Sequence, residues 1–152
     1  MRREYPEMPI AGVGVAVRRG DRVLLVQRGL EPGRGRWAFP GGVIELGETL
    51  PEAAHRELAE ECGIQARLGE VLEAVDRIER DEAGRVRYHY VVVVFRGEYA
   101  GGEAQPASDA MAARWVTADE LAALDMSPRV KALVRRVLEG NPTTVVAFAS
   151  YS

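Results

Sequence analysis

The chain has 152 residues, enough for one domain with a sizeable core, and its single cysteine excludes an internal disulfide. A net charge of -3 and a pI near 5.5 argue against a general nucleic-acid binder, which needs a basic surface to meet phosphates. No segment approaches the roughly 20 uninterrupted apolar residues that cross a bilayer, so we expect a cytoplasmic single domain over residues 1–152 without nucleic-acid or membrane partners.

The first third of the chain predicts a hairpin followed by a long loop. Residues 10–17 and 23–26 are short apolar runs, and the pair Gly20-Asp21 between them favours a turn. Over residues 27–47 this pattern stops, and glycines and prolines accumulate. A loop of this length inside a compact domain is usually functional, so we expect it to border a site.

A helix is predicted over residues 50–62. Thr49 can cap its first turn, Glu52 three residues later completes a capping box, and Gly63 is placed to end it. Apolar positions one turn apart, including Leu58, form a stripe that can pack on a sheet.

Three acidic side chains share one face of this helix. Glu57, Glu60 and Glu61 have the spacing i, i+3 and i+4, so like charges repel unless something positive lies between them. Clustered carboxylate oxygens suit a hard divalent cation, and Mg²⁺ commonly joins such groups to substrate phosphates. We therefore expect the three carboxylates to converge on Mg²⁺, with Mn²⁺ as a substitute; the alternative is a solvated acidic face.

The second half predicts further strands and two helical segments. Residues 71–80 and 85–99 read as strands joined by a turn at 81–84, and residues 90–95 read as a buried central strand. A short strand over residues 114–116 leads to a capping box at Thr117 and Glu120.

A last helix should begin at Ser127-Pro128 and end near Gly140, with residues 143–151 as a final strand or as an edge that pairs with a second copy. A homodimer is therefore one expectation. The order of elements predicts an α/β fold in the α+β sense, a mixed sheet covered by helices on its faces.

Residues 42–64 resemble the Nudix box, the motif G-x5-E-x7-R-E-U-x-E-E-x-G-U in which U is an aliphatic residue. All nine constrained positions match: Gly42, Glu48, Arg56, Glu57, Leu58, Glu60, Glu61, Gly63 and Ile64. The likeness continues in Arg28, Trp37, Pro40-Gly41-Gly42, Arg114-Trp115-Val116 and Asp119-Glu120-Leu121, so it covers most of the chain. The resemblance implies the Nudix α/β/α sandwich, a mixed β-sheet flanked by helices.

The resemblance also implies roles for the residues of the box. It assigns the metal to four residues: Gly41 through its carbonyl, Glu57, Glu60 and Glu61. Glu48 and Arg56 would brace the loop against the helix, with Arg56 orienting the carboxylates. Either Glu57 or a carboxylate of a later loop would take the proton of the attacking water.

Four residues outside the box are candidates for substrate binding. Arg28 and Arg36 flank the glycine-rich loop and suit phosphate, although plain surface solvation fits them as well. Trp37 suits stacking on a base or a place in the core. Asp109 is our first choice among the later loop acids, each of which also fits an ordinary solvated side chain.

The implied activity is Mg²⁺-dependent cleavage of the pyrophosphate bond of a nucleoside diphosphate linked to another moiety. ADP-ribose or a related nucleotide sugar is the expected small-molecule substrate. One alternative is a hydrolase that removes oxidised nucleoside triphosphates from the nucleotide pool. Another is a non-catalytic nucleotide-sensing domain, which predicts damaged box carboxylates, whereas those of this chain are intact.

Overall fold

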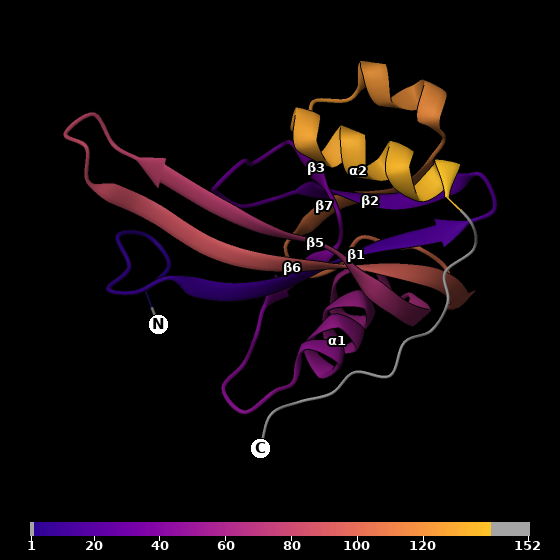
Figure 1. Cartoon of the computed structure of the whole chain (residues 1–152), viewed down its shortest axis with the longest axis horizontal. Coiled ribbons are helices and arrows are strands. Elements are labelled where there is room, and N and C mark those ends of the chain that lie inside the picture. Colours follow the sequence, from indigo (N-terminus) through magenta and orange to yellow (C-terminus); the bar gives the residue numbers. More distant parts are fainter. Residues whose placement is uncertain (1, 141–152) are drawn as a thin grey trace.

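A mixed sheet with helices on both faces forms the framework of the computed structural model, which describes residues 2–140 (Figure 1). The strands are β1 (Ile10–Arg19), β2 (Arg22–Arg28), β3 (Trp37–Ala38), β4 (Gly41–Val43), β5 (Gln65–Arg80), β6 (Val86–Gly101) and β7 (Ala110–Val116). The helices are α1 (Leu50–Cys62), the 3-10 helix η1 (Ala118–Ala123) and α2 (Pro128–Glu139). Within residues 2–140, no helix is both long and apolar enough to cross a membrane.

The sheet has the order β3-β2-β1-β6-β5, with β4 paired to β1 and β7 paired to β2. β1 and β6 are parallel, from Ile10 beside Tyr90 to Arg18 beside Glu98, and the other pairs are antiparallel. β1 meets β2 near Arg18, whereas the start of β1 pairs with β4 instead. β2 and β1 therefore separate towards the end of β2 that carries Arg28.

The two faces of the sheet carry two apolar clusters. Because side chains alternate along a strand, Val15 of β1 joins the cluster that contains Leu58 of α1, and the adjacent Ala16 joins the cluster that contains Val134 of α2. Figure 1 shows α1 on one face and α2 with η1 on the other. Full burial of a side chain such as Leu58 contributes about 1.5–3 kcal/mol, so this packing fixes α1 firmly against β1.

Several predicted elements are confirmed. The hairpin of β1 and β2 is present, α1 has the expected limits, and α2 begins at Pro128 with the Ser127 hydroxyl accepting from the backbone of Val130 at 3.1 Å. The expected mixed sheet flanked by helices is also present.

Other predictions need correction. The loop over residues 27–47 contains β3 and β4, which exist because β2 and β1 supply distant hydrogen-bond partners. β5 begins at Gln65 rather than at residue 71, since Gln65 pairs with Gly101 at the far end of β6. The predicted central strand over 90–95 is only partly buried, because Val91 is 39% exposed. The expected strand over 143–151 lies outside the described residues.

Gly63 ends α1 in a left-handed conformation, with φ 69° and ψ 23°, and its N–H donates to the carbonyl of Ala59 at 3.2 Å. Any side chain is strained in this region because Cβ crowds the following carbonyl. We expect Gly63→Ala to lower the free energy of unfolding by roughly 1–2 kcal/mol. Urea unfolding followed by circular dichroism measures this, and an unchanged midpoint would contradict it.

Candidate active site

α1 carries the acidic residues and is fixed locally at its first turn. The Thr49 hydroxyl accepts from the backbone N–H of Glu52 at 3.2 Å, and the Glu52 carboxylate accepts from the N–H of Thr49 at 3.1 Å. This capping box satisfies two backbone groups that a helix otherwise leaves open. It also fixes where the helix begins, and therefore where the later acids lie.

Arg56 links the loop before α1 to the acids on it. Its guanidinium donates to both carboxylate oxygens of Glu48, at 2.6 and 2.8 Å, and to the carbonyl of Val43 at 3.0 Å. It also donates to Glu57 at 2.7 Å and to Glu60 at 3.2 Å. The hydrogen bonds from Arg56 lower the pKa of Glu48 to about 2. The same bonds raise the pKa of Arg56 above its ordinary value. The guanidinium of Arg56 thus fastens the loop to the helix through charge-assisted hydrogen bonds.

Glu61 lies where α1, two strands and a loop residue come together. Burial is the main cause that raises its pKa to about 7, and the neighbouring charge of Glu57 adds to the effect. The guanidinium of Arg28 and a hydrogen bond from the backbone N–H of Gly41 act in the opposite direction, while Asp109 raises the pKa further. α1, β2, β4 and the residue before β7 therefore converge on this carboxyl group.

The two glycines at the start of β4 allow a close approach on each side. A Cβ on Gly42 would lie 2.5 and 2.6 Å from the two carboxylate oxygens of Glu57. A Cβ on Gly41 would overlap the carbonyl oxygen of Val13 on β1. Gly41 is thus needed for strand pairing, and Gly42 leaves the space that the Glu57 carboxylate fills.

The structure differs from the expected convergence of three carboxylates. Within residues 2–140, no three acidic, histidine or cysteine side chains are close enough together to hold a metal ion as arranged. The side chain of Glu60 is 55% exposed and accepts a hydrogen bond from Arg56. Glu57 also accepts from Arg56, whereas the carboxyl group of Glu61 is more deeply buried. The reason is that Arg56, one turn before Glu60, neutralises two of the three acids.

The candidate substrate-binding residues fall into two groups. Arg28 and Asp109 lie near Glu61, as their electrostatic effects on it indicate. Arg36 instead forms an ion pair with Asp125, with Nε and Oδ1 3.6 Å apart. The side chain of Trp37 is half-buried and packs against the apolar cluster beneath α2. Arg36 and Trp37 are therefore not brought to the acids.

Arg77 of β5 was not indicated by the sequence patterns, yet its guanidinium lies near Gly33 and Arg28. No local signal marks it, because it belongs to a strand in which charged residues recur. Only the pairing of β5 with β6 and the path of the loop after β2 bring it there.

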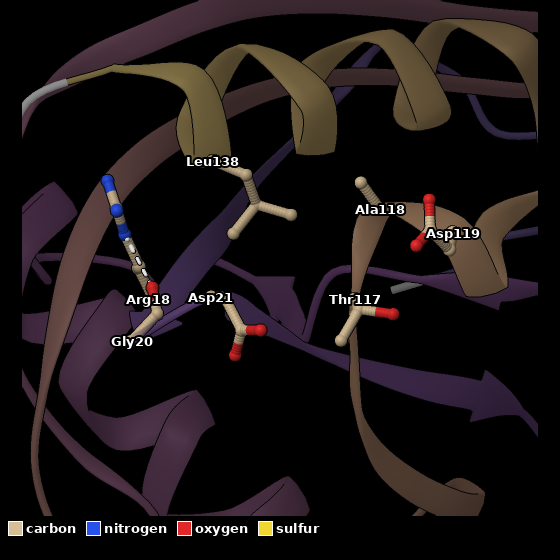
Figure 2. Close-up of a pocket in the computed structure, with 7 residues that line it drawn as sticks. All are labelled: Arg18, Gly20, Asp21, Thr117, Ala118, Asp119 and Leu138. Carbon is tan, nitrogen blue, oxygen red and sulfur yellow. Dashed lines mark hydrogen bonds between the residues drawn. The ribbon is translucent and has the colours of Figure 1, made fainter.

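A separate hollow of about 290 Å³ lies between the β1–β2 turn, the start of η1 and the end of α2 (Figure 2). Arg18 at its edge already donates to the carbonyls of Gly20, Val137 and Gly140. The other charged side chains that line it, Asp21 and Asp119, would repel a phosphate. It shares no residue with the acidic site, so we place the chemistry at α1.

Comparison with known proteins relates most of the chain to one family. The family model described as the NUDIX domain matches residues 8–137. An ADP-ribose pyrophosphatase of Methanocaldococcus jannaschii is 32% identical over 117 residues, which are 77% of this chain but only 65% of that protein. A Mycobacterium tuberculosis protein named as a candidate 8-oxo-dGTP diphosphatase is 36% identical over 137 residues, covering 88% of this chain and 93% of that one.

Solved structures agree with the architecture. A MutT NUDIX hydrolase from Burkholderia pseudomallei has a TM-score of 0.73 and 29% identity over 86% of this chain and 99% of its own. The NUDIX domain of Shewanella oneidensis NrtR, solved with ADP ribose, has a TM-score of 0.69 and 23% identity, with 88% of each chain covered. These matches confirm the expected α/β/α sandwich. Because the family model spans most of the sequence and relatives above 30% identity cover most of it, the chain belongs to the Nudix family of hydrolases.

Proposed function

We propose that this protein is a magnesium-dependent hydrolase that cleaves the pyrophosphate bond of a nucleoside diphosphate linked to another moiety. The observation that carries the proposal is the grouping of Glu57 and Glu61 beside Gly41, with Arg28 next to them and Arg56 behind. Two carboxylates and a guanidinium can hold the two ends of a metal–diphosphate complex. A single-domain, cytoplasmic enzyme is part of this proposal.

The donor groups fit Mg²⁺. Carboxylate oxygens are its preferred protein ligands, and the raised pKa of Glu61 reflects burial beside Glu57, a charge pair that a divalent cation would relieve. Glu57 and Glu61 would hold the ion, joined by the carbonyl of Gly41 and by Glu60 once its carboxylate leaves Arg56. When bound, the ion supplies charge for the phosphate oxygens and a lowered pKa for a coordinated water.

The side chains of the site have distinct tasks in this proposal. Arg56 keeps the Glu57 carboxylate beside Gly42 and so orients it. In hydrolysis, a water oxygen bonds to phosphorus, the bridging P–O bond breaks, and the departing phosphate keeps the bonding electrons. Glu57 takes the proton of the water, with Asp109 as the alternative base.

ADP-ribose or a related nucleotide sugar is the proposed substrate. The name of the M. jannaschii relative and the ADP ribose bound to the S. oneidensis NrtR domain support it. An oxidised nucleoside triphosphate is the second candidate, because the M. tuberculosis relative matches over 93% of its length. A non-catalytic sensor receives no support from the box, because the four glutamates that the motif requires are all present.

A panel of ADP-ribose, other nucleotide sugars, a dinucleotide and 8-oxo-dGTP, each with Mg²⁺ and chromatographic identification of products, tests the proposal. We expect AMP and ribose 5-phosphate from ADP-ribose, activity with Mn²⁺ as well, and none in EDTA. A higher kcat/KM for 8-oxo-dGTP, with pyrophosphate release, would favour the second candidate. Tight binding without turnover of any compound would contradict an enzymatic role.

A further inference from the structure

Two arginines from distant strands meet at Gly33, in the loop between β2 and β3. A Cβ on Gly33 would lie 2.9 Å from Nη2 of Arg77 and 3.6 Å from Cδ of Arg28. Gly33 has φ +79°, so it follows a backbone path that side chains rarely adopt. The loop therefore passes directly against both arginine side chains.

Electrostatics also indicates that the two guanidinium groups are neighbours. Burial lowers the pKa of Arg28, and the charge of Arg77 lowers it further. Glu61, Tyr90 and Glu31 act in the opposite direction. Two like charges in a partly buried place are unfavourable, and an anion between them would remove the conflict.

The existing partners leave room for such an anion. From the side chain of Arg28 the structure shows one hydrogen bond within residues 2–140, in which Nε donates to the carbonyl of Pro32 at 2.7 Å. Arg77 donates from Nη2 to Glu79 at 3.3 Å, and these two side chains are 35% and 47% exposed. The alternative role for Arg77 is this ion pair with Glu79 alone. An ion pair this exposed contributes little to stability, so it competes only weakly with a phosphate for the guanidinium.

We propose that Arg28 and Arg77 form one anion-binding pair, which holds the phosphate of a nucleoside diphosphate that is distal to Glu57 and Glu61. The inference rests on the proposed function for its substrate class. Arg28 is a neighbour of both Glu61 and Arg77, so it can link the acids and the distal phosphate. Arg77 then acts as a substrate-binding residue that selects diphosphates over monophosphates.

The test compares ADP-ribose hydrolysis by Arg77→Gln, Arg77→Lys and the wild-type protein. Loss of charge-assisted hydrogen bonds predicts that Arg77→Gln raises KM about tenfold to a hundredfold while kcat changes less than about threefold. Arg77→Lys should recover part of the loss, because the charge remains while the planar fork does not. Arg80→Gln is the matched control on the same strand, where the side chain donates to Gly84, and it should leave KM unchanged.

Calorimetric titration with ADP and with AMP, without metal, separates this inference from the proposed function. We expect Arg77→Gln to weaken ADP binding and to spare AMP, with thermal midpoints within about 2 °C of wild type. If the wild type hydrolyses no diphosphate, the proposed function fails, and weaker ADP binding by Arg77→Gln still supports the pair. If hydrolysis proceeds with unchanged KM in Arg77→Gln, or ADP binding equals wild type, the pair is rejected.

Discussion

Replacement of Glu61 by glutamine should lower kcat by about 100- to 1,000-fold, the range for loss of one preorganised polar group that stabilises the transition state. Glu61 lies where α1, β2, β4 and Asp109 come together, next to Glu57 and Arg28, so its carboxylate is central to the site. The fold should survive, because burial already penalises the charged form and glutamine is neutral and of the same size. Steady-state kinetics at several Mg²⁺ concentrations measures the loss.

Glu139→Gln is the matched control, since it makes the same change at an exposed position of α2 and should leave kcat unaltered. Circular dichroism and the thermal midpoint would check that both variants are folded. Unchanged turnover in folded Glu61→Gln would remove the metal role from this residue. It would also remove the main support for an active site on α1.

Replacement of Gly42 by alanine should separate activity from stability. The added methyl group would occupy the space of the Glu57 carboxylate, which is the end of a flexible side chain and can move aside at little cost to the fold. Misplacement of a reacting group by about 1 Å can reduce the rate about 100-fold, and we expect a loss of that order in kcat. Kinetics together with the thermal midpoint measures both parts of the prediction.

Two other glycines provide the comparison. Gly14 has its nearest neighbours at 3.7 and 3.8 Å, so Gly14→Ala should keep both activity and stability. Gly41→Ala should instead destabilise the protein, because its methyl group would overlap the backbone of β1. Full activity in Gly42→Ala would show that the position of the Glu57 carboxylate does not matter.

The sequence was sufficient for α1 because its limits depend on local chemistry. Thr49 and Glu52 form the expected capping box, and Gly63 adopts the left-handed conformation that ends the helix. The hydrophobic stripe with Leu58 also packs as expected. Each of these signals involves residues within one or two turns, so spacing alone reveals them.

The remaining features depend on partners far away in the chain. β4 forms because Gly41 and Gly42 pair with β1, and nothing within residues 27–47 signals that pairing. The meeting of Arg77 with Gly33 depends on the register of β5 and on the loop path together. The spacing of the helix acids favoured a divalent cation over Arg56 as their positive partner, and it did not reveal that Arg56 donates to both Glu57 and Glu60.

The parallel pairing of β1 with β6 has a consequence for biosynthesis. Ile10 lies beside Tyr90 and Arg18 beside Glu98, so partners are 80 residues apart. At translation rates of about 5–20 residues per second, the ribosome needs roughly 4–16 s to supply the second strand after the first. During that interval β1 can pair with β2 and β4 but lacks β6, its long parallel neighbour, and nascent chains that stop before Val86 should depend on chaperones to avoid aggregation.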